Sequence, residues 1–313
     1  MMIVAAGTLV VGYAGISISI LLHLVYAPPM PLVTTPAALG LDYRDVTFPS
    51  RGDHVPLRGW FMPGILPGGG LTAHRAIIVV HGARANRADP GTGVLALSAA
   101  LARHSFAVLA FDLRGMGESP RAPLSMGLFE QRDALGAVDF LRVGRLPYPQ
   151  LGRPERIGGW GVSMGAATLL MAAAHEPAIR AVVADSAYAD IEPLMQRQFA
   201  SYSPLLKGLM PGILLSARLL YGIDFHQVRP VAGVARLAPR PLLIIQGADD
   251  TLNRPADVQE LAIAAERAPH ADVQVWIVPG AEHGQSFRVA GALYVRRVAG
   301  FFDAALGPAA RSG

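Results

Sequence analysis

The chain has 313 residues, of which 52% are hydrophobic and only 16% are charged, and its net charge at pH 7 is +4. This much apolar sequence excludes a disordered chain, which lacks the side chains to offset its conformational entropy. The absence of cysteine excludes a disulfide framework, a thiolate zinc site and a cysteine nucleophile. The basic residues are scattered rather than clustered, so we expect no nucleic-acid partner.

The N-terminal segment is long and apolar enough to cross a membrane. Residues 1–41 contain no Asp, Glu, Lys or Arg, and residues 3–26 are mostly apolar. As a helix this apolar stretch reaches roughly 36 Å, against about 30 Å of hydrocarbon in a bilayer. We therefore expect residues 1–27 to be a single-pass transmembrane anchor, without assigning the side on which the rest of the chain lies. The alternatives are a cleaved signal peptide, which the lack of a basic n-region disfavours, and a buried helix.

Residues 28–41 are rich in proline and are interpreted as a linker, and residues 42–313 as the globular domain. In this domain apolar runs that predict strands alternate with segments of helical spacing. Strands are expected at 76–80, 106–111, 156–160, 181–184, 241–245 and 273–278, and helices at 94–103, 128–142, 164–174, 256–267 and 289–306. The alternation predicts an α/β fold, with a mostly parallel sheet covered by helices on both faces and a site at the carboxyl ends of the strands.

A G-x-S-x-G sequence, Gly161-Val162-Ser163-Met164-Gly165, lies between a predicted strand and a predicted helix. Such a serine occupies a sharp turn, and the glycines let the strand and helix backbones approach each other. The turn exposes the hydroxyl at a helix N-terminus, where negative charge is favoured. We therefore predict Ser163 as a nucleophile. The alternative is a tight turn with an incidental serine.

A serine hydroxyl needs a base, and the base needs an orienting carboxylate. His283 lies in the loop after the strand at 273–278 and is the predicted base, with a solvated loop histidine as the alternative. Asp249 and Asp250 follow the strand at 241–245, and Asp250 is the predicted acid. Asp249 and then Asp185, which follows the strand at 181–184, rank below it.

Backbone N–H groups near the nucleophile are expected to stabilise the developing oxyanion. The N–H of Met164, the residue after the predicted nucleophile, is one predicted donor. The second is the N–H of Ala83 in the His81-Gly82-Ala83-Arg84 loop, which follows the strand at 76–80.

The order Ser163, Asp250, His283, together with His81-Gly82 after an early strand, resembles the α/β-hydrolase superfamily. The segment 112–119 (DLRGMGES) is similar to the D-x-R-G-x-G-x-S loop of many of its members. The segments HGARANR, FDLRGMGES, GVSMGA and DSAYAD most resemble the serine-aminopeptidase-like and monoglyceride-lipase-like branch, which includes bacterial members with an N-terminal membrane anchor. The resemblance implies an α/β-hydrolase fold with an eight-stranded, mostly parallel sheet. It also implies that the apolar segment within 190–239 is a cap over the site, with an ordinary crossover helix as the alternative.

These observations predict a membrane-anchored serine hydrolase that acts by acyl transfer on a small-molecule ester or amide, including a lipid. A carboxylic ester is the favoured substrate, an aminopeptidase-like enzyme is the alternative, and a non-catalytic binding protein on the same fold is the alternative of another class. No nucleotide-binding, metal-binding or calcium-loop pattern occurs, so we expect no cofactor and no metal. We also expect that removal of residues 1–27 leaves ester cleavage intact.

Overall fold

The computed structural model describes residues 2–26, 28 and 30–308, without the side chains of residues 2–6, 204 and 205. Met1, Ala27 and Pro29, which fall in the predicted anchor and linker, lie outside the described residues, as do residues 309–313.

An eight-stranded sheet forms the centre of the molecule, in the order β1-β2-β6-β5-β7-β8-β9-β10. Its strands are β1 (Arg44–Pro49), β2 (Pro56–Met62), β5 (Arg75–Val80), β6 (Ala107–Phe111), β7 (Arg156–Val162), β8 (Ile179–Asp185), β9 (Leu242–Gly247) and β10 (Val273–Val278). Strands β5 to β10 pair in parallel, and β2 pairs antiparallel with both β1 and β6. The predicted α/β fold with a mostly parallel sheet is therefore confirmed. A separate small hairpin joins β3 (Gly64–Ile65) and β4 (Leu71–Thr72).

Helices cover both faces of this sheet. One face packs against α2 (Val94–Arg103) and α10 (Ser286–Leu306), and the other against α3 (Glu130–Val143), α4 (Met164–Ala173) and α9 (Pro255–Glu266). The inner strands are mostly apolar because both of their faces are covered. All side chains of β5, β6 and β9 are buried, for example.

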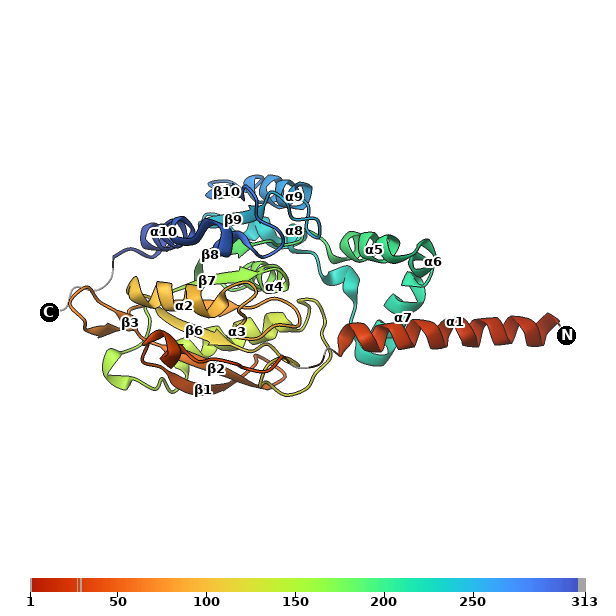
Figure 1. Cartoon of the computed structure of the whole chain (residues 1–313), viewed down its shortest axis with the longest axis horizontal. Coiled ribbons are helices and arrows are strands. Elements are labelled where there is room, and N and C mark those ends of the chain that lie inside the picture. Colours follow the sequence, from red (N-terminus) through yellow and green to blue (C-terminus); the bar gives the residue numbers. More distant parts are fainter. Residues whose placement is uncertain (1, 27, 29, 309–313) are drawn as a thin grey trace.

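The segment between β8 and β9 is helical and leaves the body of the molecule. It contains α5 (Ile191–Tyr202), α6 (Pro204–Lys207) and α7 (Met210–Tyr221), and it returns to the core through α8 (Pro230–Gly233). Figure 1 shows α5, α6 and α7 at one end of the molecule, beside the N-terminal helix α1 (Met2–Val25). We call α5, α6 and α7 together the cap.

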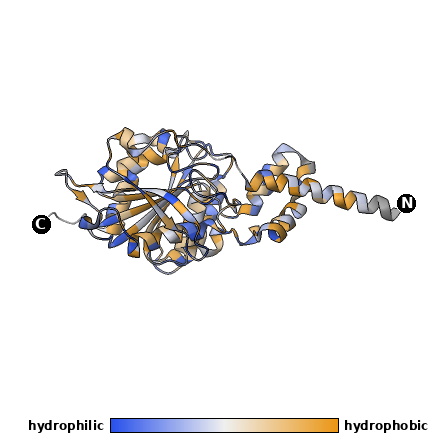
Figure 2. Ribbon diagram, turned by 90° about the horizontal axis from the view of Figure 1, so that it is seen from below, coloured by the Kyte–Doolittle hydropathy of each residue, from blue (hydrophilic) through white to orange (hydrophobic). Residues whose placement is uncertain are grey.

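Helix α1 projects from the same end as the cap, opposite the C-terminus (Figure 1). Within the described residues, Gly7–Val25 is long and apolar enough to cross a membrane, a property that an N-terminal signal sequence shares. The helix is exposed near its start, where Leu9 is 75% exposed, and buried near its end, where Leu21 is 0% and Val25 is 2% exposed. Figure 2 shows hydrophobic residues along α1 and the adjacent cap helices as well as in the central strands. The last turns of α1 are thus part of the hydrophobic core.

Candidate active site

The turn between β7 and α4 presents Ser163 in a conformation that few side-chain-bearing residues adopt, with φ 55° and ψ −124°. The turn is so tight that it requires glycine on both sides. A Cβ on Gly161 would lie 2.6 Å from the Gly165 carbonyl oxygen, and a Cβ on Gly165 would lie 2.2 Å from the Val80 carbonyl oxygen. The backbone N–H of Ser163 donates to the Asp185 carbonyl at 2.8 Å. The hydroxyl therefore stands at a defined point at the N-terminus of α4.

The three residues predicted as nucleophile, base and acid lie in one hydrogen-bonded chain. His283 Nε2 is 2.8 Å from Ser163 Oγ, and His283 Nδ1 is 2.8 Å from Asp250 Oδ2. The Asp250 side chain is fully buried, whereas that of His283 is 26% exposed. A buried carboxylate on Nδ1 fixes the imidazole tautomer in which Nε2 accepts a proton.

Both carboxylate oxygens of Asp250 have two hydrogen-bond partners. Asp250 Oδ1 accepts from the backbone N–H groups of Leu252 and Asn253, each at 2.9 Å, and Oδ2 accepts from Gln246 Nε2 at 2.8 Å as well as from His283. The neighbouring Asp249 is exposed to solvent. The structure thus places Asp250, and not Asp249, against the imidazole.

Asp185, the third candidate acid, is buried at the end of β8 and has other partners. It accepts from the hydroxyl groups of Tyr294, Ser186 and Ser286 at 2.8, 2.9 and 3.1 Å. The Ser186 hydroxyl in turn accepts from the N–H of Gly284, the residue after His283. Asp185 therefore supports the loop that carries His283 rather than contacting the imidazole.

Burial raises the pKa of Asp185 to about 6, partly offset by its hydroxyl donors. The native state then binds this proton more tightly than the unfolded chain, so the contribution to stability is greatest below pH 4 and is lost as pH rises through 6. The free energy of unfolding of wild type relative to Asp185→Asn should fall by about 2 kcal/mol between pH 4 and pH 7. Urea denaturation of both proteins between pH 4 and pH 7 measures this difference in the free energy of unfolding. A difference that does not change with pH would contradict a raised pKa of Asp185.

The predicted oxyanion loop lies beside the serine. A Cβ on Gly82 would be 3.4 Å from Ser163 Cβ, and Ala83 and Ser163 line the same pocket. The fully buried His81 supports the loop, because its Nδ1 lies 2.7 Å from the Gly82 carbonyl oxygen and its Nε2 accepts from Leu113 N–H at 3.1 Å. Burial lowers the pKa of His81, in keeping with a neutral structural imidazole. Met164, whose N–H is the other predicted donor, is buried at the first position of α4.

The charged residues of the 112–119 loop form hydrogen bonds and ion pairs within the body of the molecule. Asp112 accepts from the backbone N–H of Arg87 at 2.7 Å and of Glu118 at 2.8 Å, and it forms a buried ion pair with the Arg87 guanidinium. Arg114 pairs with Asp133 and Asp53. The conspicuous charged residues of this segment therefore have structural partners and lie outside the reacting groups.

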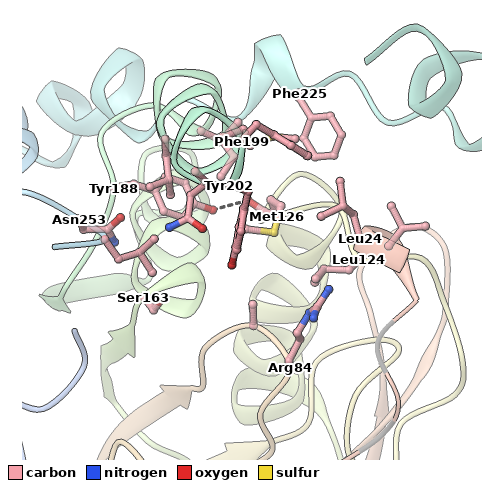
Figure 3. A pocket seen from close by; sticks show the side chains of 17 residues that line it. Leu24, Arg84, Leu124, Met126, Ser163, Tyr188, Phe199, Tyr202, Phe225 and Asn253 are labelled. Carbon is pink, nitrogen blue, oxygen red and sulfur yellow. Dashed lines mark hydrogen bonds between the residues drawn. The ribbon is translucent and has the colours of Figure 1, made fainter. Parts of the chain in front are cut away.

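Ser163 lies at the bottom of a pocket of about 400 Å³ (Figure 3). The walls come from the body, the cap and the end of α1. The lining residues are Leu24, Val25, Ala83, Arg84, Leu124, Met126, Tyr188, Ile191, Leu194, Met195, Gln198, Phe199, Tyr202, Phe225, Leu252 and Asn253. Sequence reasoning missed the contribution of Leu24 and Val25, since nothing in an apolar helix indicates which residue reaches a distant serine.

Across residues 2–26, 28 and 30–308, no three His, Asp or Glu side chains are grouped so as to hold a metal ion.

A family model described as alpha/beta hydrolase fold matches residues 75–212. Among solved structures, the chain is similar to the esterase Pf2001 of Pyrococcus furiosus, with 25% identity, a TM-score of 0.73, and coverage of 90% of this chain and 100% of that one. It is also similar in fold to an acylaminoacyl peptidase of Pyrococcus horikoshii, with 17% identity, a TM-score of 0.62, and coverage of 84% of this chain and 42% of that one. A comparison with curated proteins found no match.

The chain therefore has the α/β-hydrolase fold, and its similarity to an esterase supports a hydrolase.

Proposed function

We propose that this protein is a membrane-anchored serine hydrolase that cleaves carboxylic esters by acyl transfer. The observation that carries the proposal is the continuous hydrogen-bonded chain from Ser163 through His283 to Asp250, at the bottom of an apolar pocket. Because Ser163, His283 and Asp250 are all present and His283 lies within hydrogen-bonding distance of the other two, a catalytically silent binding protein is disfavoured.

In the proposed reaction, His283 Nε2 removes the proton of Ser163 while Oγ attacks the ester carbonyl. Asp250 stabilises the imidazolium that forms, and the N–H groups of Met164 and Ala83 bind the oxyanion. His283 then gives its proton to the leaving alcohol. Water attacks the acyl-enzyme with His283 as the base again, which releases the carboxylic acid and regenerates the serine.

The pocket favours an apolar acyl group over an amino-terminal peptide. An aminopeptidase would need a carboxylate near Ser163 to hold the substrate ammonium group, and among the described residues no Asp or Glu lines the pocket. The acidic residues considered for this role have other positions: Glu118 pairs with Arg87, Glu192 contacts His226, and Glu282 is exposed.

The length and composition of Gly7–Val25 support the membrane anchor. With a single predicted span, the protein would be a single-pass membrane protein, with the catalytic domain attached through the end of α1.

Wild type should react with a fluorophosphonate probe, because an activated serine attacks its phosphorus, and Ser163→Ala should not react. Wild type that has not been exposed to the probe should hydrolyse p-nitrophenyl esters at least 100-fold faster than aminoacyl-p-nitroanilides, measured as kcat/KM at equal enzyme concentration. Ser98→Ala is the matched control, since this buried serine on α2 donates to the Val94 carbonyl and does not line the pocket, and it should retain labelling. Folded wild type that does not label would refute the serine-hydrolase proposal, whereas preference for anilides would refute only the ester.

A further inference from the structure

Helices α1 and α7 pack side by side in the same direction. The Tyr13 hydroxyl donates to the Gly208 carbonyl at 2.9 Å and accepts from Gly212 N–H at 3.2 Å, and the Tyr26 ring packs edge-on against Tyr221 with centroids 5.8 Å apart. A Cβ on Gly212 would lie 2.3 Å from Ser17 Oγ, so the glycine is what lets the two helices approach. Residues 13–25 of α1, and Tyr26 after it, therefore pack against the cap.

The part of α1 that extends past α7 is too short by itself to cross a bilayer. Residues 2–12 extend beyond the contact with α7 and measure roughly 16 Å as a helix, about half of the ~30 Å hydrocarbon thickness. The whole of α1 measures about 36 Å. For α1 to reach across the membrane, the cap that is packed on its second half must enter the membrane with it.

The cap surface suits a lipid environment. Leu215, Leu219 and Leu220 on α7 are 58%, 73% and 54% exposed, and Tyr202 at the end of α5 is 78% exposed. From residue 198 to residue 217 the only charged side chain is Lys207, whose long stem can carry its ammonium group toward water.

The backbone of the turn between α5 and α7 forms its own hydrogen bonds, as a lipid environment requires. The N–H groups of Ser203, Leu206 and Leu209 donate to the carbonyls of Phe199, Ser203 and Leu206 at 3.0 Å each.

Three exposed arginines lie where α1 and α7 meet the body of the molecule. Arg84 donates to the His23 carbonyl at 2.9 Å, the Arg121 guanidinium lies 4.8 Å from the centre of the Tyr26 ring, and Arg218 lies in the last turn of α7. Arginine and tyrosine at the end of an apolar helix are typical of the headgroup region of a membrane.

We propose that α1 and the cap insert together into a lipid bilayer, up to the level of Arg84, Arg121 and Arg218. The pocket then adjoins the lipid phase, because Leu24 and Tyr202 line it from opposite sides (Figure 3). On the proposed ester hydrolase function, on which this part rests, the substrate class is a long-chain acyl ester that enters from the bilayer, with its acyl chain between α1 and α5.

The absence of cysteine in the wild-type chain allows a direct test of depth. Full-length Val10→Cys, Leu219→Cys and Val143→Cys variants, each labelled with a nitrobenzoxadiazole fluorophore, are reconstituted into phosphatidylcholine–phosphatidylglycerol vesicles with and without nitroxide-labelled lipid. Val10 on α1 is 67% exposed, Leu219 is on the cap, and Val143 on the body is 76% exposed and serves as the control. We expect at least threefold quenching of the fluorophore at positions 10 and 219 and none at 143.

The other results contradict the proposal in distinguishable ways. Quenching at position 10 but not at 219 would leave α1 as an anchor and overturn joint insertion. A fluorophore at 219 that is shielded from water but not quenched by lipid would mean that a second copy of the chain covers α7. No quenching at either position would overturn the membrane anchor itself.

The same vesicles test substrate entry. Leu219→Glu should lower the hydrolysis of a long-chain ester embedded in the bilayer at least 10-fold, and should change p-nitrophenyl acetate hydrolysis less than twofold, because Leu219 is outside the pocket. Val143→Glu is the charge-matched control and should change neither rate. Equal loss on both esters would overturn lipid-phase entry. If wild type cleaves no ester, the ester function fails, while the quenching result for joint insertion stands.

Discussion

Asp250→Asn should lower kcat/KM for ester hydrolysis by roughly 10³- to 10⁴-fold, the scale of effect seen when the orienting carboxylate of a catalytic triad loses its charge. The carboxylate accepts from His283 Nδ1 at 2.8 Å while two backbone N–H groups hold its other oxygen. An amide of the same shape keeps part of this framework but does not stabilise the imidazolium, and its NH₂ group favours the wrong imidazole tautomer. The measurement is steady-state hydrolysis of a p-nitrophenyl ester.

Asp249→Asn is the matched control, because it makes the same chemical change one residue away on an exposed side chain. It should change kcat/KM less than threefold. Circular dichroism and thermal unfolding of both variants establish that the loop remains folded. A larger loss in Asp249→Asn than in Asp250→Asn would reverse the assignment of the acid.

Removal of residues 1–26 should destabilise the protein and lower ester hydrolysis more than 10-fold, instead of only releasing it from the membrane. Leu21 and Val25 are buried in the core, and burying an aliphatic side chain contributes roughly 1.5–3 kcal/mol, so about 3–6 kcal/mol is lost. The Val25 carbonyl also accepts from Leu124 N–H at 2.8 Å. The sequence-based expectation that activity survives this removal is therefore not supported by the packing.

Removal of residues 1–11 is the comparison, because it deletes exposed residues such as Leu9 and Val10 and leaves the packed half of α1 in place. This shorter deletion should keep p-nitrophenyl acetate hydrolysis within twofold of wild type and lower the melting temperature by no more than 2 °C. Equal stability and activity in the two truncated proteins, measured in the same detergent, would show that the end of α1 is not part of the pocket wall.

The central part of the fold could be predicted because its signals are local. Strands such as Arg75–Val80 and Leu242–Gly247 each contain a run of at least four consecutive apolar residues, since both of their faces are covered, and each is followed by a helix. The antiparallel strands β1 and β2 were not found among these runs. β1 is an edge strand in which exposed and buried residues alternate and charged side chains occur, so its sequence resembles a polar loop.

In the candidate site, too, some features could be predicted from local sequence and others could not. The turn at Ser163 could be predicted because glycines on both sides are needed wherever a strand enters a helix this sharply. The choice between Asp249 and Asp250 depends on a register between two loops that lie 33 residues apart, and only the packed structure brings one carboxylate to His283.

For the N-terminal helix, the local sequence encodes its length and apolar character, whereas tertiary packing decides what it contacts. Its length and lack of charge follow from composition alone, because the apolar character of a segment is a property of its own residues. Which surface covers that segment depends on shape and on small residues elsewhere in the chain, here Gly212 on α7. By itself the sequence determined a mostly parallel sheet, a glycine-flanked turn at Ser163 and an apolar helix. Only tertiary packing made the end of that helix a wall of the pocket.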